Sequence, residues 1–179
     1  MAPRPDFARH RQRVLERLAP HEAVLLFGAP HAVRNGDAEY RYRPDSDLYW
    51  LTGWLHPQVA LFLRPGEAPL TLFVQPRDPQ AEQWAGRRPG PEGAVADFGA
   101  DQAFPYTELA DKLPTLLQGV QVLHHAFAVD PEHDTLVMGA IRKAARAART
   151  NGLCVPTTFH SPAHLLHELR LVKEEDELA

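Results

Sequence analysis

The chain has 179 residues, of which 44% are hydrophobic and 23% are charged, and its formal net charge at pH 7 is −4. This length and composition fit one ordinary globular domain that can bury a core of its own. The net negative charge argues against a general polyanion binder, because neutralising phosphates takes a dense basic surface, so we expect no nucleic-acid partner. The single cysteine, Cys154, excludes an intramolecular disulfide framework and a multi-cysteine zinc site.

Membrane and secreted proteins are not indicated either. No apolar run approaches the roughly 20 residues that a membrane span needs. The first 19 residues contain no unbroken apolar stretch of the kind found in secretory signals. We therefore expect a soluble, cytoplasmic protein without a membrane partner. We also expect Cys154, which precedes Val155 and Pro156 in an apolar segment, to be a buried and inert thiol.

The first third of the chain predicts one helix and three strands. An apolar stripe with arginines around it predicts an amphipathic helix over residues 6–19. The apolar run 23–27, closed by glycine and proline, is typical of a strand buried on both faces. The apolar runs 59–63 and 70–74, separated by a Pro-Gly turn, predict a hairpin.

The middle of the chain is less regular. Residues 76–105 are rich in proline, glycine and acidic groups, so we expect irregular structure apart from a helical turn near 79–84. A leucine stripe predicts a helix over 106–118, kinked or broken at Pro114. The apolar run 120–123 predicts another strand.

The last third adds two helices. An Asp-Pro pair at 130–131 predicts a helix start, and this helix runs to about Arg149 before an Asn-Gly C-cap pair. Residues 153–155 look strand-like, and a Ser-Pro pair at 161–162 starts the last helix. Strands mixed with flanking helices indicate an α/β fold, a three-layer sandwich with a mixed β-sheet flanked by helices.

The first candidate site is the acidic and aromatic stretch over residues 34–54. It contains four carboxylates: Asp37, Glu39, Asp45 and Asp47. Paired carboxylates can serve in acid/base catalysis or bind a metal. The alternative is a surface loop that leads into a helix, with Asp45 and Ser46 as caps. The pattern leaves both readings open.

The second candidate is the stretch 82–88, in which Trp84 lies close to a glycine and two arginines. Indole and guanidinium groups both suit recognition surfaces. The alternative is a tryptophan that covers the edge of the core beside solvated arginines. The sequence does not decide between the two.

Histidines form the third candidate. His160, His164 and His167 have spacings that can place imidazoles on one metal, although the proline at 162 separates the first from the other two. The alternative is a structural role at a helix start. His124 and His125, at the end of a predicted strand, are expected to be edge or loop residues. No nucleophile elbow, phosphate-binding loop or dinucleotide-binding glycine pattern is present, so the residues show no complete active site.

Three segments together resemble a known family. They are residues 37–53, 82–88 and 167–178, with the pattern Tyr-Arg-x-x-Ser-Asp-x-x-Trp-x-Thr-Gly in the first and Leu-Arg-x-x-Lys before an acidic stretch in the last. Their order and spacing resemble the N-terminal domain of aminopeptidase P, the Xaa-Pro aminopeptidase of the creatinase/prolidase family. The resemblance covers essentially the whole chain. It implies a ribonuclease-H-like domain over residues 1–172, with 173–179 starting the linker helix to a C-terminal metallopeptidase domain absent from this sequence.

The resemblance also implies a function. The second domain of the family holds two divalent metals, usually manganese, which activate a hydroxide that attacks the bond before a proline. The first domain is implied to be non-catalytic, to cover the active-site cleft and to build a homo-oligomer, commonly a tetramer. The residues implied for a substrate pocket or subunit interface are Asp37, Trp84 and, with a shifted alignment, Arg149. No catalytic or metal-binding residue is expected in this chain, which should be inactive alone on peptides with proline second.

Three alternatives stay open. One is the N-terminal domain of a prolidase or a creatinase-like enzyme, against which the Trp-Ala-Gly-Arg-Arg sequence from Trp84 argues. Another is a free-standing interaction module. The last is a small zinc protein that uses His160, His164 and His167.

Overall fold

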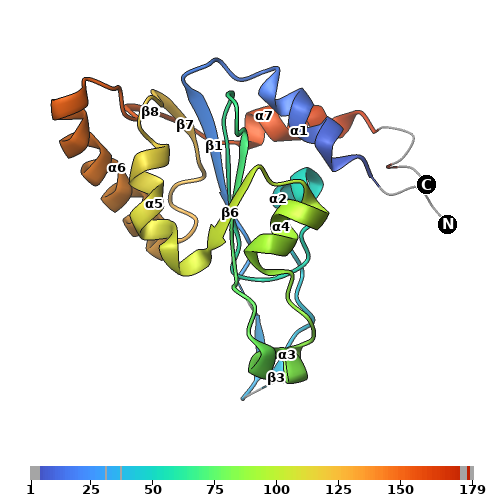
Figure 1. Cartoon of the computed structure of the whole chain (residues 1–179). Helices are drawn as coiled ribbons and strands as arrows, with labels where there is room; N and C mark the ends of the chain where they lie inside the picture. The colour runs from blue at the N-terminus through green and yellow to red at the C-terminus, as the bar shows by residue number, and fades with distance from the viewer. Residues whose placement is uncertain (1–4, 31, 37, 174–176, 178–179) are drawn as a thin grey trace.

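The computed structural model describes residues 5–30, 32–36, 38–173 and 177 (Figure 1). Within these ranges, the side chains outside the description are Val33, Ala38, Glu39, Ala81, Trp84 and Ala85. In this part of the chain, no helix combines the length and the apolar character that a bilayer crossing requires.

A six-stranded mixed sheet forms the middle layer, in the order β6-β5-β4-β1-β7-β8. Its strands are β1 (Glu22–Phe27), β4 (Ala60–Leu63), β5 (Leu70–Val74), β6 (Gln102–Pro105), β7 (Val122–His124) and β8 (Thr158–His160). The central strand β1 runs antiparallel to β4 and parallel to β7. The predicted hairpin is the antiparallel pair β4 and β5.

Helices cover both faces of the sheet and complete the three layers, as predicted (Figure 1). On one face lie α5 (Leu109–Leu116), preceded by the 3₁₀ turn Tyr106–Glu108, and α6 (Pro131–Asn151). On the other face lie α1 (Phe7–Leu15), α2 (Ser46–Thr52), α4 (Gly90–Phe98) and α7 (Ala163–Leu171). Pro114 lies inside α5 without ending it.

The strand period of two divides the core between the two faces. In β1, Val24 and Leu26 pack with α1, α2, α4 and α7, whereas Ala23 and Leu25 pack with α5 and α6. All four side chains are buried. Because successive side chains point to opposite faces, a strand buried on both sides needs a continuous apolar run, which is the pattern observed in the sequence.

Local capping sets the helix ends that the sequence predicted. Asp130 caps α6 by accepting hydrogen bonds from the backbone N–H groups of residues 132 and 133, and Gly152 ends it with a positive φ of 70°. Asp45 caps α2 by accepting from the backbone N–H groups of residues 47 and 48. The reading of Asp45 as a helix cap is therefore confirmed, since an Asp side chain satisfies amides that the helix leaves unpaired.

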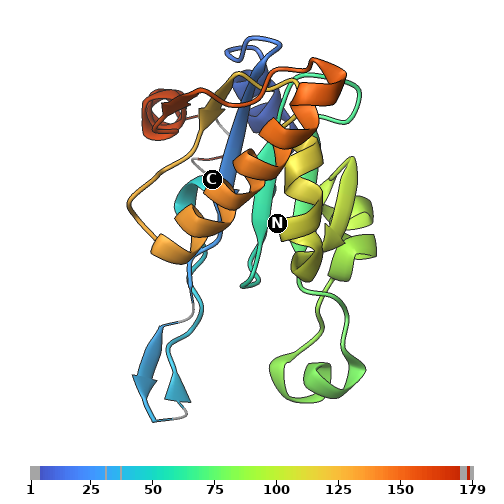
Figure 2. The same ribbon diagram turned by 90° about the vertical axis from the view of Figure 1, so that its left-hand side faces the viewer.

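Two thin segments project from the same end of the sandwich (Figure 2). One is the two-stranded ribbon of β2 (Val33–Asn35) and β3 (Ala38–Glu39). The other carries the short helix α3 (Pro79–Ala85), between β5 and α4. The predicted helical turn near Pro79 is thus confirmed, and it lies away from the body of the domain.

Three predictions were wrong. Residues 153–155 form no strand: the chain leaves α6 at Gly152, and the edge strand β8 begins only at Thr158. Cys154 is consequently exposed, on the connecting segment and not in the core. Residues 76–105 contain the helix α4 and the strand β6, which the prolines and glycines of this segment concealed.

Candidate functional site

The two projections consist largely of exposed side chains. Tyr40, which follows β3, is 57% exposed, and the guanidinium of Arg34 lies 6.0 Å from the centre of its ring. Exposed aromatic and arginine side chains are typical of protein interfaces. The described side chains of the two projections do not belong to either hydrophobic cluster of the core. The projections are therefore candidates for contacts with another body of protein.

An ion pair holds the base of the α3 projection. Arg77 donates to Glu82 at two points, with Nε to Oε1 at 3.3 Å and Nη2 to Oε2 at 3.2 Å. This hydrogen-bonded pairing lowers the pKa of the Glu82 carboxyl. A two-point guanidinium–carboxylate contact fixes direction as well as distance. The pair connects the first turn of α3 to Arg77, in the segment that follows β5.

The structure separates the three site residues that the resemblance implied. Asp37 lies outside the described residues, between β2 and β3. Trp84 belongs to α3, with its side chain outside the description. Arg149 is exposed in the last turn of α6, and that end of α6 points away from the projections in both views (Figures 1 and 2). Within one chain, Arg149 is therefore not brought to the same place as α3.

The predicted histidine cluster is not a metal site in the described part of the chain. There, no group of three or more His, Cys, Asp or Glu side chains could hold a metal ion. His160 contacts the ring of His124, with centroids 5.4 Å apart, whereas His167 Nε2 lies 3.9 Å from Asp47 Oδ2. His160 and His167 thus have different neighbours, and His164 is exposed on α7.

His124 and His125 are both buried. His125 lies in the loop that follows β7, as expected, whereas His124 belongs to β7 itself and is not at the edge of the sheet. Their exposed fractions are 9% and 5%. β7 lies between β1 and β8, so the chain at His124 is inside the sheet. His124 Nε2 lies 3.2 Å from Glu22 Oε2, which explains how this polar ring is accommodated.

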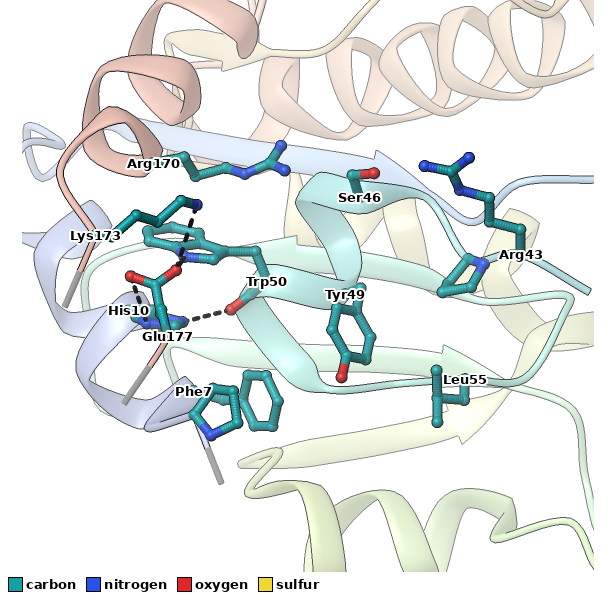
Figure 3. Close-up of a pocket in the computed structure, with 12 residues that line it drawn as sticks. Phe7, His10, Arg43, Ser46, Tyr49, Trp50, Leu55, Arg170, Lys173 and Glu177 are labelled. Atoms are coloured by element: carbon teal, nitrogen blue, oxygen red, sulfur yellow. Dashed lines mark hydrogen bonds and ion pairs between the residues drawn. The ribbon is translucent and has the colours of Figure 1, made fainter. Parts of the chain in front are cut away.

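A pocket of about 460 Å³ lies between α1, α2 and the chain that follows α7 (Figure 3). Its lining combines aromatic rings with cationic side chains and one carboxylate. The lining residues are Pro5, Phe7, His10, Arg43, Pro44, Ser46, Tyr49, Trp50, Leu55, Arg170, Lys173 and Glu177. The segment that leaves the domain therefore packs against its first two helices.

Glu177 is the centre of the contacts in this pocket (Figure 3). Its side chain is only 8% exposed, and its Oε1 accepts a hydrogen bond of 2.8 Å from Trp50 Nε1. Lys173 Nζ lies 3.8 Å from Oε1, and His10 Nε2 lies 3.8 Å from Oε2. A buried carboxylate is tolerated only with such partners, because leaving water without them is costly.

His10 and Trp50 form a fixed platform for this carboxylate. Their rings stack with centroids 4.3 Å apart and an interplanar angle of 9°. His10 Nδ1 lies 2.7 Å from the Trp50 carbonyl oxygen, which can only accept, so Nδ1 carries hydrogen and Nε2 faces Glu177. The first two helices therefore present the indole N–H and the imidazole edge together.

A second contact ties α7 to the start of α2. The guanidinium of Arg170 pairs with the carboxylate of Asp47, through Nη1 and Oδ1. Asp47 thus takes part in an ion pair between two helices, which gives this one carboxylate of the acidic stretch a structural role. Sequence reasoning missed Glu177, His10 and Trp50, since no local pattern connects residues that are 127 positions apart.

The comparison of the sequence with known families gives one match. The family described as "Aminopeptidase P, N-terminal domain" matches residues 7–124. The Xaa-Pro aminopeptidase of Escherichia coli (strain K12) is 36% identical over 179 residues, which are 98% of this chain and 40% of that protein.

Solved structures agree with the sequence comparison. An aminopeptidase of Pseudomonas aeruginosa superimposes with a TM-score of 0.91 at 36% identity, covering 99% of this chain and 41% of that one. A zinc-substituted Escherichia coli aminopeptidase P in complex with product gives a TM-score of 0.88 at 35% identity, covering 97% and 40%. The chain thus spans about two fifths of the length of these relatives.

Proposed function

The chain belongs to the aminopeptidase P family as an N-terminal domain, and from this premise we propose that it is the non-catalytic part of a metal-dependent Xaa-Pro aminopeptidase. In this proposal, residues 1–172 form the domain and 173–179 begin the linker to a catalytic second domain. The domain covers the active-site cleft and builds the homo-oligomer, a tetramer. The substrates are peptides with proline at the second position, and the location is the cytoplasm.

The metal chemistry of this proposal belongs to the second domain. A pair of divalent ions, manganese in our proposal, would activate water for attack on the peptide bond. The described residues of this chain offer no group of three or more side chains that could hold such an ion. They do not fit the metal pair, and no catalytic step is assigned to them.

The observation that carries the covering role is the pair of projections. A two-stranded ribbon is marginally stable in water by itself, and so is a helix of seven residues. Both projections leave the sandwich at the same end (Figure 2), and the side chains described in them lie outside the two core clusters. Elements of this kind gain stability when they pack on another body, which supports contacts with a second domain or a neighbouring subunit.

The three proposed site residues would contribute to different contacts. Asp37 stands in the sequence between β2 and β3, and Trp84 belongs to α3. In this proposal their acidic and indole groups would reach a cleft beside the domain. The indole would close an apolar pocket for the substrate proline and exclude water. Arg149, at the end of α6 that points away from the projections, would act at the same cleft only from another copy of the chain.

Peptidase assays of two proteins, one with and one without a second domain, test the proposal. Residues 1–179 alone should release no amino acid from Xaa-Pro peptides in the presence of Mn²⁺. A protein that continues this chain with a second domain of the length found in the relatives should release the first residue and should be a tetramer by light scattering. Cleavage by residues 1–179 alone would refute the non-catalytic role. A longer enzyme that is active as a monomer would refute the oligomer-building role.

A further inference from the structure

Helix α6 has one face in the core and the opposite face at the outside of the molecule. Its buried side chains belong to the cluster that it shares with α5, and they are Val137, Ala140, Ile141 and Ala144. α6 lies at the outside of the sandwich in both views (Figures 1 and 2). Because seven residues are close to two helical turns, Glu132, Gly139 and Arg146 form one stripe on the face that points away from the core. We call this stripe the outer stripe.

Gly139, in the middle of the outer stripe, is not required by the packing of the chain itself. A Cβ built on Gly139 would meet nothing within 4 Å beyond the backbone of its own helix. Glycine in the interior of a helix is less stable than alanine, because it loses more conformational freedom on folding. On an outer helix face it has one clear advantage, since the absence of a side chain lets another helix approach closely.

The charge of the outer stripe changes sign along the helix. Glu132 is exposed in the first turn, whereas Arg146 is exposed in the second half of α6. Within the described part of the chain, the ion pairs of α6 are made by His133, Asp134 and Lys143, so neither end of the stripe has an ionic partner there. A surface that is negative at one end and positive at the other is complementary to itself when two copies run antiparallel.

An antiparallel crossing at Gly139 matches the two charges by position. Glu132 and Arg146 are each seven residues from Gly139, and positions equally far from a two-fold axis lie opposite each other. Glu132 of one copy would therefore face Arg146 of the other, and the symmetry gives this pair twice. By the same count Lys143 would face the uncharged Thr135, so no like charges meet. A parallel arrangement would instead place Arg146 beside Arg146.

We propose that the outer stripe of α6 is a self-association surface, on which a second copy of this chain docks its own α6 in antiparallel orientation at Gly139. The inference rests on the proposed function, because it names a contact for the oligomer that the domain is proposed to build. A partner with charge of one sign fits less well, since it would meet a like charge at Glu132 or at Arg146. One pair of crossed helices is a small interface, so we expect weak association from this face alone.

Charge reversal tests the pairing in residues 1–179. Sedimentation velocity at up to about 500 μM should show a concentration-dependent dimer, because small interfaces bind weakly. Glu132→Arg and Arg146→Glu should each weaken dimerisation by about tenfold or more, since each places like charges opposite each other. An equimolar mixture of these two variants should dimerise again, because every opposed pair then has opposite signs. The matched control is Glu67→Arg, at an exposed position in the turn between β4 and β5.

Gly139→Ala separates an interface from a role in the folding of the helix. The melting temperature of the monomer should rise, because alanine favours helices and its Cβ has room in the chain. Dimerisation should weaken by about tenfold, because two methyl groups then stand where the helices meet. Gly139→Ala that dimerises as tightly as the parent protein would contradict a close crossing at this residue.

The longer enzyme distinguishes failure of this inference from failure of the proposed function. There, light scattering should give a smaller species for Glu132→Arg than for Glu67→Arg. If the parent enzyme is an oligomer and Glu132→Arg leaves its size unchanged, the oligomer-building role stands and the outer stripe is not its contact. If the longer enzyme is a monomer, the proposed oligomer fails, and sedimentation of residues 1–179 decides the self-association of α6. A monomer at every concentration, or equal dimerisation of Glu132→Arg and Glu67→Arg, would overturn the inference.

Discussion

The indole N–H of Trp50 donates a hydrogen bond of 2.8 Å to the carboxylate of Glu177, across 127 positions of sequence. Trp50 lies on α2, next to the core, and Glu177 lies on the segment that leaves the domain after α7. The bond is buried at both ends, with Trp50 6% and the Glu177 side chain 8% exposed. It fixes the direction in which the chain leaves the sandwich.

Removal of the Glu177 acceptor should therefore cost stability. Glu177→Leu leaves the Trp50 indole N–H buried and unpaired, and we expect a loss of about 1–3 kcal/mol in the free energy of unfolding, measured with urea. Glu177→Gln keeps an accepting oxygen and should lose less. Glu168→Gln on α7 is the control, because the ion pair of Glu168 with Arg17, at 3.6 Å, is exposed at both ends. Equal losses for Glu177→Leu and this control would contradict the structural role of the bond.

Gly53, at the C-terminal end of α2, should be far less replaceable than Gly152 at the end of α6. Both have a positive φ, 69° and 70°, so alanine costs about 1–2 kcal/mol at either position. A Cβ at Gly53 would also lie 2.7 Å from Phe7 Cζ, whereas a Cβ at Gly152 meets nothing within 4 Å. Overpacking should add about 1–3 kcal/mol to the loss for Gly53→Ala. Urea unfolding of the two variants measures this difference, and adding Phe7→Ala should reduce it.

Acid should destabilise the domain through His125. Burial lowers its pKa in the folded state, with Asp134 opposing and His133 adding to the shift, so the unfolded state binds the proton more readily. The unfolding free energy should be unaffected by His125 above about pH 6.5, the pKa of histidine in the unfolded state, and should fall as the pH decreases below that value. His125→Asn should flatten the dependence of the unfolding free energy between pH 7.5 and about 5.5. The exposed His164→Asn is the control, and an unchanged slope in His125→Asn would contradict this account.

Trp84 should matter for turnover and not for folding. In the longer enzyme of our proposal, Trp84→Ala should lower kcat/KM on Xaa-Pro peptides by about tenfold or more, because the proposed apolar contact with the substrate proline would be lost. Gln83→Ala, on the neighbouring exposed position of α3, is the matched control. The melting temperatures of both variants should stay near that of the parent enzyme. Unchanged kcat/KM in Trp84→Ala would contradict a role of Trp84 in substrate binding and would favour a structural role.

The sequence by itself determined the local features of this protein. The caps at Asp45 and Asp130 and the C-cap at Gly152 were predictable, because each depends on a side chain and on backbone groups within a few residues. The apolar runs predicted β1, β4 and β5 for the same reason, since a strand buried on both faces has a continuous hydrophobic pattern. The motifs in residues 37–53, 82–88 and 167–178 indicated the family before any contact was known.

The tertiary structure decided everything that joins distant segments. The contact between Trp50 and Glu177, the approach of His125 Nε2 to Asp134 Oδ1 at 3.9 Å, and the exposure of Cys154 depend on which faces meet after folding. Local propensity carries no information on such contacts, because the neighbours that bury a side chain can be more than a hundred residues away, as Trp50 and Glu177 are. The projection of β2, β3 and α3 from one end of the sandwich is likewise a property of the assembled sheet. The connection between β1 and β4 and the connection between β5 and β6 leave the sandwich at the same end.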